Sequence, residues 1–361
     1  MSPHGISSKP GPRLALERDP FHIPAPMEIA RPYLMFLGDV GDQLAAKTAH
    51  GVVDWRPGWC AGQQRLAGCV ADCGLPEMTL AEAVGAGVRT MVIGVVNPGG
   101  HLPKHWVERI VEALNAGLDV AAGLHTRLGS VPEIAAAAAR CGRTLHDVRH
   151  CEEIFAVGKG SKRPGLRLLT VGTDCSVGKK YTALAIAREL EDRGVDADFR
   201  ATGQTGVLIA GRGVAIDAVV SDFLSGAVEW LTPAAAPGHW DIIEGQGSLF
   251  HPSFAAVTLG LLHGAQPDAF VVCHEPTRAN MRGVSNSLPT IESVIEQTIR
   301  MGRLTNEAIA CVGIAVNTGS LDEGASLALL EELQHEHGVP TVDPMRGGVA
   351  TLVDHLQQRF P

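Results

Sequence analysis

The chain has few aromatic side chains, no CxxC pair and no long apolar run, and each absence excludes a class of protein. Aromatic residues account for only 4% of its 361 residues while glycine is abundant, and this composition favours close packing of helices on a sheet. The eight cysteines contain no CxxC pair. Cys60, Cys69 and Cys73 are spaced too loosely for a metal motif, and we interpret them as reduced thiols in a core.

Blocks of like charge and targeting signals are also absent. The net charge is −9 and no block of like charges occurs, which argues against a nucleic-acid partner. No apolar run reaches transmembrane length, and the N-terminal segment MSPHGISSKPGPRLALERDP contains no apolar core of a signal peptide. We therefore expect a cytoplasmic protein with a small-molecule substrate and no membrane or nucleic-acid partner. We also expect it to form a homo-oligomer.

The length predicts two domains. Residues 1–30 are rich in proline, serine and charge and are interpreted as an irregular arm of the first domain, residues 1–155. Apolar runs then alternate with helical patterns, which predicts a parallel sheet. The predicted strands are 33–37, 88–96 and 118–123, and the predicted helices lie around 44–48, at 104–116 and at 131–140.

A basic linker, AVGKGSKRPG, opens the second domain, residues 156–361. Its apolar runs are short and rich in valine and isoleucine, which suits strands that helices cover on both faces. The predicted strands are 166–171, 197–201, 241–244, 269–273, 310–316 and 340–342. The predicted helices are 179–193, 217–230, 253–263, 289–301, 321–336 and 347–358.

A glycine-bounded loop, GTDCSVG, connects the first strand of this domain to the amphipathic helix KKYTALAIARELEDRG. This arrangement directs backbone N–H groups and the positive end of the helix dipole at an anion. Lys179 can reach terminal phosphates. The segment therefore predicts a phosphate-binding loop (P-loop) in a doubly wound, P-loop NTPase-like domain. The predicted ligand contacts are Gly172, Thr173, Asp174, Cys175, Ser176, Val177, Gly178, Lys179, Lys180, Tyr181 and Thr182.

The loop departs from the standard GxxxxGK[ST] pattern. Five residues separate Gly172 from Gly178, and Lys180 replaces the serine or threonine whose hydroxyl binds Mg²⁺ in nucleotide hydrolases. Thr182 lies two residues further on and faces another side of the helix. The usual metal ligand is absent and a second cation occupies its place, so we predict no metal site.

The motif GTDxxVGK resembles the phosphate loop of dethiobiotin synthetase and its relatives. The segment DIIEGQG resembles the acidic strand end of that family, in which the glutamate, here Glu244, helps to hold the metal. Asn317 follows a later strand, as does the residue that reads the nucleotide base in that family. This resemblance implies that Glu244 and Asn317 belong to the site, and it covers only the second domain.

Nearly the whole chain resembles a narrower P-loop family, long described as of unknown function, with a Rossmann-like first domain. The matching segments are GDVGDQLAAKTAHGVVDW, AGLHTRLGSVPEI, GTDCSVGKKYTAL, TGQTGVLIAGRG, EGQGSLFHP and NTGSL. Some members of that family are D-glutamate N-acetyltransferases that use acetyl-CoA. The resemblance therefore implies acetyl transfer to an acidic amino acid, with acetyl-CoA as cosubstrate.

Acetyl transfer needs a base for the acceptor amine and no metal. Glu244, His251 and His274 lie near predicted strand ends, where doubly wound sheets bind ligands, and are the candidate bases. Glu244 has the alternative of binding Mg²⁺, and His251 that of capping the helix that follows Pro252. A structural role is equally open for His274. For Asp174 we favour a role in shaping the loop over helix capping or proton transfer.

An acidic substrate also needs cations. Arg278 and Arg282 lie in a loop after a strand, and Arg212 lies in another loop; arginine binds carboxylates with two donors. A solvated surface arginine is the alternative in each case. In the first domain Lys47, Thr48 and the turn 97–100 are comparable positions, where an ordinary helix or turn residue is the stronger interpretation.

Two other functions remain open from the sequence. The first is an ATP- and Mg²⁺-dependent enzyme of the dethiobiotin synthetase type that activates a carboxylate, and the second is a non-catalytic nucleotide-binding regulator. Lys180 favours acetyl transfer, whereas Glu244 and Asn317 favour ATP.

The position of Cys175 raises the question of a covalent route. The loop amides, the helix dipole and the adjacent lysines are expected to lower the pKa of its thiol, which would allow an acetyl-cysteine intermediate. We nevertheless predict direct transfer, because a thiolate would compete with the phosphates for the same N–H donors.

Overall fold

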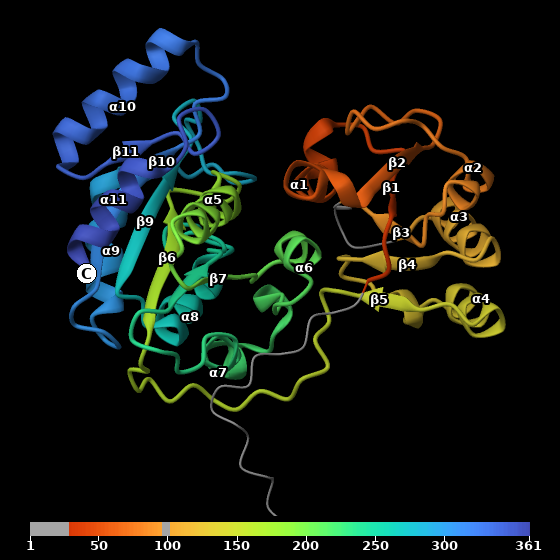
Figure 1. Ribbon diagram of the computed structural model, residues 1–361, viewed down its shortest axis with the longest axis horizontal. Helices are drawn as coiled ribbons and strands as arrows, with labels where there is room; N and C mark the ends of the chain where they lie inside the picture. Colours follow the sequence, from red (N-terminus) through yellow and green to blue (C-terminus); the bar gives the residue numbers. More distant parts are fainter. Residues whose placement is uncertain (1–28, 96–101) are drawn as a thin grey trace, which may run out of the picture.

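The computed structural model describes residues 29–95 and 102–361. It contains two parallel β-sheets (Figure 1). The turn at 97–100 lies outside the described residues, as does nearly all of the N-terminal arm. The predicted fold class, two α/β domains with parallel sheets, is confirmed. Among the helices within these two ranges, none is both long and apolar enough to span a bilayer.

The first sheet has the strand order β2-β1-β3-β4-β5, and every pair in it is parallel. Its strands are β1 (Tyr33–Gly38), β2 (Cys60–Arg65), β3 (Thr90–Ile93), β4 (Asp119–Ala122) and β5 (Leu145–Asp147). Its helices are α1 (Lys47–Trp55), α2 (Leu80–Gly85), α3 (Lys104–Asn115) and α4 (Pro132–Cys141), with short 3₁₀ turns η1 (Gln43–Ala46), η2 (Pro57–Trp59) and η3 (Leu128–Ser130).

Two strands of this sheet were not predicted. The sequence of β2, CAGQQR, is polar, and Gln63 is nevertheless buried because its amide nitrogen donates to Asp72 and Glu77. The edge strand β5 has three residues and no apolar run. Both strands are stabilised by neighbours distant in sequence, so the local pattern does not reveal them.

The second sheet has the order β11-β10-β9-β6-β8-β7 and is also parallel. All six of its strands were predicted: β6 (Leu166–Gly172), β7 (Ala197–Arg200), β8 (Trp240–Ile243), β9 (Ala269–His274), β10 (Ala310–Val316) and β11 (Thr341–Val342). Hydrophobic clusters cover both of its faces. This two-sided burial is the reason that its apolar runs were easy to recognise.

Six of the seven helices of the second domain were predicted to within a few residues: α5 (Lys179–Asp192), α7 (Ser221–Leu231), α8 (Ala255–Ala265), α9 (Ile291–Gly302), α10 (Glu323–His337) and α11 (Ala350–Arg359). Helix α7 begins later than predicted because a separate 3₁₀ turn, η4 (Ile216–Ala218), precedes it. The seventh helix, α6 (Gln204–Ala210), was not predicted; it is short and contains a glycine.

Helix α6 lies between the two domains and packs against α1 (Figure 1). Its apolar residues Val207, Leu208 and Ile209 are buried in the hydrophobic core of the first domain. The hydroxyl of Thr48 lies 3.1 Å from that of Thr205, across the same contact. The two domains are therefore joined by a packed interface, which holds the carboxyl ends of their strands around a common space.

Candidate active site between the two domains

A cavity of about 1240 Å³ is lined by side chains from both domains. Nearly all of the lining segments lie in the loops and helix starts after strands of the two parallel sheets, the position where such sheets bind ligands. The first domain contributes Gln43, Leu44, Lys47, His50, His125 and Arg149. The second contributes the loop 175–182, residues 203–205, the segment 244–247, Arg282, Asn317 and residues 343–345, among others.

The predicted phosphate-binding loop has the backbone that such a loop requires. Gly178, immediately before α5, has a φ of 108°, which a side chain would strain. A Cβ at Gly172 would lie 2.8 Å from the Val177 side chain and 2.9 Å from the Cys273 carbonyl oxygen, so this position also requires glycine. Lys179 is buried and its ammonium donates to the Asp174 carbonyl at 2.7 Å. Burial lowers the pKa of Lys179, and an incoming anion would favour its charged form.

Asp174 holds the loop in shape. Its fully buried carboxylate accepts the Cys175 N–H at 2.6 Å, the Arg278 guanidinium at 2.9 Å and the Arg282 N–H at 2.8 Å. A carboxylate with three donors has little capacity left for proton transfer. The geometry therefore favours the loop-shaping role.

The three arginines have different surroundings. Arg278 donates to the carbonyl oxygens of Cys175 and Ser176 and pairs with Glu275. Its guanidinium is therefore engaged in supporting the loop. Arg282 is exposed, lines the cavity and donates to the Ser176 hydroxyl at 3.1 Å.

Arg212 pairs with Asp198 at 2.5 Å and does not line the cavity. The prediction that Arg212 clamps the substrate is therefore not supported by its position.

Lys180 faces the first domain. A Cβ on Gly51 of α1 would lie 2.5 Å from its ammonium nitrogen, which shows how closely the lysine approaches that helix. The ammonium also lies 5.0 Å from the centre of the Tyr181 ring. Burial lowers the pKa of Lys180 to about 8, the nearby Glu244 opposes this shift, and Lys47 adds to it.

Glu244 is the one predicted base that lines the cavity. It is buried after β8, and one carboxylate oxygen accepts the N–H groups of Thr202 at 3.0 Å and Gly203 at 3.1 Å. Burial raises its pKa, and the charge of Lys180 partly offsets this effect. Lys180 and Glu244 thus influence each other electrostatically, without a direct ion pair, beside the loop where a nucleotide hydrolase would hold Mg²⁺.

The two histidines predicted as bases do not line the cavity. The Ser253 N–H donates to Nδ1 of His251 at 3.2 Å, so Nε2 carries the proton and donates to the Arg282 carbonyl at 3.0 Å. With both nitrogens engaged, His251 has a structural role, but it does not cap α8, because the N-cap residue Phe254 has no side-chain cap hydrogen bond. Nδ1 of His274 lies 3.0 Å from the Thr173 hydroxyl, and burial lowers its pKa.

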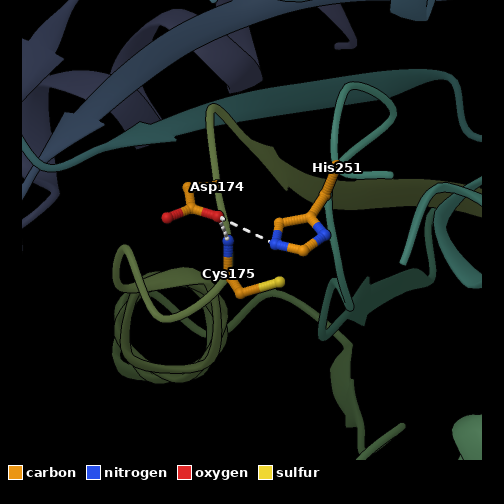
Figure 2. Close-up of side chains that lie close together, drawn as sticks. All are labelled: Asp174, Cys175 and His251. Atoms are coloured by element: carbon orange, nitrogen blue, oxygen red, sulfur yellow. Dashed lines mark hydrogen bonds and ion pairs between the residues drawn. The ribbon is translucent and has the colours of Figure 1, made fainter. Parts of the chain in front are cut away.

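Asp174, Cys175 and His251 lie close together (Figure 2) and are the one group among the described residues with the spacing of metal ligands. Asp174 already accepts three hydrogen bonds, and both ring nitrogens of His251 are engaged. Burial raises the pKa of the Cys175 thiol, although Lys179, Lys47 and Arg282 oppose it. These residues therefore do not fit a metal ion. The prediction of a lowered thiol pKa is wrong, because desolvation outweighs the neighbouring cations.

Two further predicted contacts have clear positions. The Thr182 hydroxyl donates to the Gly178 carbonyl within α5 at 3.1 Å, which occupies its proton. Asn317 follows β10 and lines the cavity together with Pro344 and Met345. Leu44, Phe254 and Met345 are exposed apolar side chains on the cavity wall. The cavity thus offers apolar surface as well as positive charge.

Sequence reasoning missed the contribution of the first domain. Gln43, His50, His125 and Arg149 were not selected, and Lys47 was treated as an ordinary helix residue. The signal was present, because Gln43, Lys47 and His50 lie in GDVGDQLAAKTAH, and His125 in AGLHTRLGS. Both segments were among those that carried the family resemblance.

Family comparisons agree with this two-domain site. Residues 154–353 match the model described as Domain of unknown function (DUF1611_C) P-loop domain, and residues 61–151 match the DUF1611_N Rossmann-like domain. A protein of Tritonibacter scottomollicae named D-glutamate N-acetyltransferase is 51% identical over 329 residues, covering 91% of this chain and 99% of that protein. A protein of the same name from Pseudoalteromonas sp. is 48% identical over 331 residues, covering 91% of this chain and all of that protein.

The crystal structure of a DUF1611 family protein from Anabaena variabilis superposes with a TM-score of 0.83 at 30% identity. The superposition covers 91% of this chain and 100% of that one. The Rossmann-like model precedes the P-loop model along the chain. This chain belongs to the DUF1611 family, with a Rossmann-like N-terminal domain and a C-terminal P-loop domain.

Proposed function

We propose that the protein transfers an acetyl group from acetyl-CoA to the amine of D-glutamate. The observation that carries this proposal is its near-complete alignment, at about half identity, with two proteins named D-glutamate N-acetyltransferase. The cavity supports it, because it combines a phosphate-binding loop with apolar walls and cations from both domains. A dicarboxylate acceptor and a polyanionic donor both require such charge.

In this proposal the P-loop binds the phosphates of CoA. Glycine at positions 172 and 178 lets the backbone approach an anion closely, and the α5 N-terminus adds its dipole. Lys179 and Arg282 are the side chains that would hold the phosphates. The apolar residues Leu44, Phe254 and Met345 offer surface for the uncharged parts of CoA.

In the proposed site Lys180, with Glu244 nearby, supplies the positive charge that a metal ion would otherwise provide. In this role the ammonium of Lys180 supplies positive charge beside the loop, and the charge of Glu244 favours the protonated form of Lys180. CoA places the whole pantetheine arm between its phosphates and its thioester. A base beside the loop is therefore far from the reacting carbon, and we assign Glu244 to stabilising the charge of Lys180 rather than to proton transfer.

The direct test is to incubate the protein with acetyl-CoA and a panel of D- and L-amino acids while following thiol release. Thiol release with D-glutamate and formation of N-acetyl-D-glutamate, measured by mass spectrometry, are expected. Turnover of ATP with phosphate release, and no thiol release with any acceptor, would replace this proposal with the ATP-dependent alternative. Glu244 and Asn317 are the residues that favour that alternative.

A further inference from the structure

The side of the cavity that the first domain forms has titratable side chains whose presence phosphate binding at the P-loop does not explain. Three side chains reach it from positions after three strands of one sheet: Lys47 after β1, His125 after β4 and Arg149 after β5. The carboxyl edge of this sheet is where ligands of Rossmann-like folds bind. This wall therefore has the position of a second substrate subsite, opposite the phosphate-binding loop.

Lys47 is a cation without its own counter-ion. It is half-buried at the first position of α1 and forms neither a hydrogen bond nor an ion pair with the residues that the structure describes. Burial lowers its pKa, the positive charges of Arg282 and Arg149 lower it further, and Cys175 and Asp217 oppose this shift in part. An ammonium in such surroundings gains stability when an anion binds beside it.

Arg149 has a carboxylate partner and fixes the geometry of this wall. Its buried guanidinium pairs with Asp217 and donates to the Gln204 side chain at 2.7 Å and the Gly123 carbonyl at 3.2 Å. These contacts connect the loop after β5 to α6 and η4 of the second domain. Asp217, a carboxylate on this side of the cavity, therefore pairs with Arg149 and forms no ion pair with Lys47 among the described residues.

His125 has an available imidazole. It lines the cavity, and its ring forms no hydrogen bond within residues 29–95 and 102–361. The charged and titratable groups that influence it are Arg149 and His150 after β5 and Asp217 of η4. Burial, followed by the charge of Arg149, lowers its pKa, so the ring is neutral at neutral pH and can accept a proton.

The strand order of the first sheet separates these groups along the cavity. Lys47 is the first residue of α1, the helix that the Lys180 ammonium approaches at Gly51. His125 follows β4, which lies two strands away from β1 in the order β1-β3-β4. His125 therefore lies further along the cavity wall from the contact between α1 and Lys180 than Lys47 does.

We propose that this wall binds the acidic acceptor, with Lys47 holding a carboxylate and His125 accepting a proton from the amine. The inference rests on the proposed acetyl transfer and names the acceptor half of that site. The amine nitrogen forms a bond to the thioester carbon, and the carbon–sulfur bond breaks with its electron pair going to sulfur. Of the three ammonium protons, one stays on the amide, one passes through His125 to the sulfur, and one goes to solvent.

The first test separates acceptor binding from donor binding. Lys47→Met keeps the length of the side chain and removes its charge. Its KM for D-glutamate should rise roughly ten- to hundredfold, with the KM for acetyl-CoA unchanged. Lys47→Arg should retain most of the affinity, and Lys104→Met, on an exposed lysine of α3, should match the wild type. A rise in the KM for acetyl-CoA instead would assign Lys47 to a CoA phosphate and overturn the proposal.

The second test concerns the proton. His125→Gln should lower kcat roughly 10²- to 10⁴-fold, with the Kd of D-glutamate, measured by calorimetry, unchanged. The wild-type kcat/KM should fall as pH drops and His125 becomes protonated, and this acid limb should be absent from the residual activity of the variant. His335→Gln, on the exposed end of α10, is the matched control. Full activity of His125→Gln, with a melting temperature equal to that of the wild type, would overturn the assignment.

The two proposals fail in different ways. If the wild type acetylates D-glutamate and Lys47→Met and His125→Gln have the same kinetic parameters as the wild type, the assignment of the acceptor subsite is wrong. The proposed function is then retained. If the wild type does not acetylate D-glutamate, the proposed function is wrong, and the subsite falls with it.

Discussion

Lys179 and Lys180 follow one another in the chain, yet their side chains have different neighbours. Lys179 is enclosed by the loop and donates to the Asp174 carbonyl. We expect Lys179→Ala to weaken CoA binding by about 1.5–3 kcal/mol, because a charge-assisted hydrogen bond to a phosphate is lost. Calorimetric titration with CoA measures this change, with Lys104→Ala as the control. Unchanged affinity would contradict the assignment of the loop as a phosphate site.

The pKa of Lys180 predicts a pH dependence. Lys180 is protonated below its pKa of about 8 and loses its charge as pH rises through that value. If its charge supports donor binding, kcat/KM for acetyl-CoA should fall above about pH 8, since this parameter reports the free enzyme. Lys180→Arg should move the alkaline limb to higher pH, because arginine stays charged. An identical alkaline limb in Lys180→Arg would exclude Lys180 as its source.

Cys175 lies in a loop whose backbone groups bond to the side chains of Asp174 and Arg278. Because burial raises its pKa, we expect no acetyl-cysteine intermediate and nearly full activity of Cys175→Ser. Mass spectrometry of the protein after incubation with acetyl-CoA, without acceptor, tests this directly. An acetyl adduct on Cys175, together with loss of turnover in the serine variant, would establish the covalent route.

At the scale of secondary structure, the contact between α1 and α6 joins the domains. Gly51 permits it, since a Cβ there would lie 2.5 Å from the Lys180 ammonium and 2.6 Å from the Thr205 methyl group. Glycine to alanine normally stabilises a helix by about 1 kcal/mol. At Gly51 we expect destabilisation instead, because overpacking costs about 1–3 kcal/mol.

Thermal unfolding distinguishes these effects. Gly85 in α2 is the matched control, because a Cβ there would meet no atom within 4 Å. Gly85→Ala should unfold at the same temperature as the wild type or slightly higher, whereas Gly51→Ala should unfold at a lower temperature. Equal shifts of the unfolding temperature in both variants would mean that the contact between α1 and α6 accommodates the extra methyl group without loss of stability.

At the scale of the whole molecule, the two domains surround one cavity with cations. Lys47 comes from the first domain, and Lys179, Lys180 and Arg282 come from the second. Because a lysine occupies the position of the usual magnesium ligand, acetyl transfer should survive dialysis against EDTA. An assay of thiol release with and without Mg²⁺ checks this. Complete loss with EDTA and recovery with Mg²⁺ would favour the ATP-dependent reading of the site.

The sequence predicted the second domain well because its strands are buried on both faces and read as continuous apolar runs. It predicted the first domain less completely. The polar strand β2 depends on hydrogen bonds of Gln63 to residues 9 and 14 positions away. Helix α6 depends on apolar contacts with the other domain.

The sequence by itself determined the two α/β domains, the phosphate-binding loop and the family resemblance, because these are encoded in local periodicity and in contiguous motifs. Only the tertiary structure decided which polar residues share a site. It engaged both nitrogens of His251, paired Arg212 with Asp198, and brought Lys47 and His125 to the cavity. The physical reason is that burial, hydrogen-bond saturation and the convergence of strand ends arise from contacts between residues far apart in the chain.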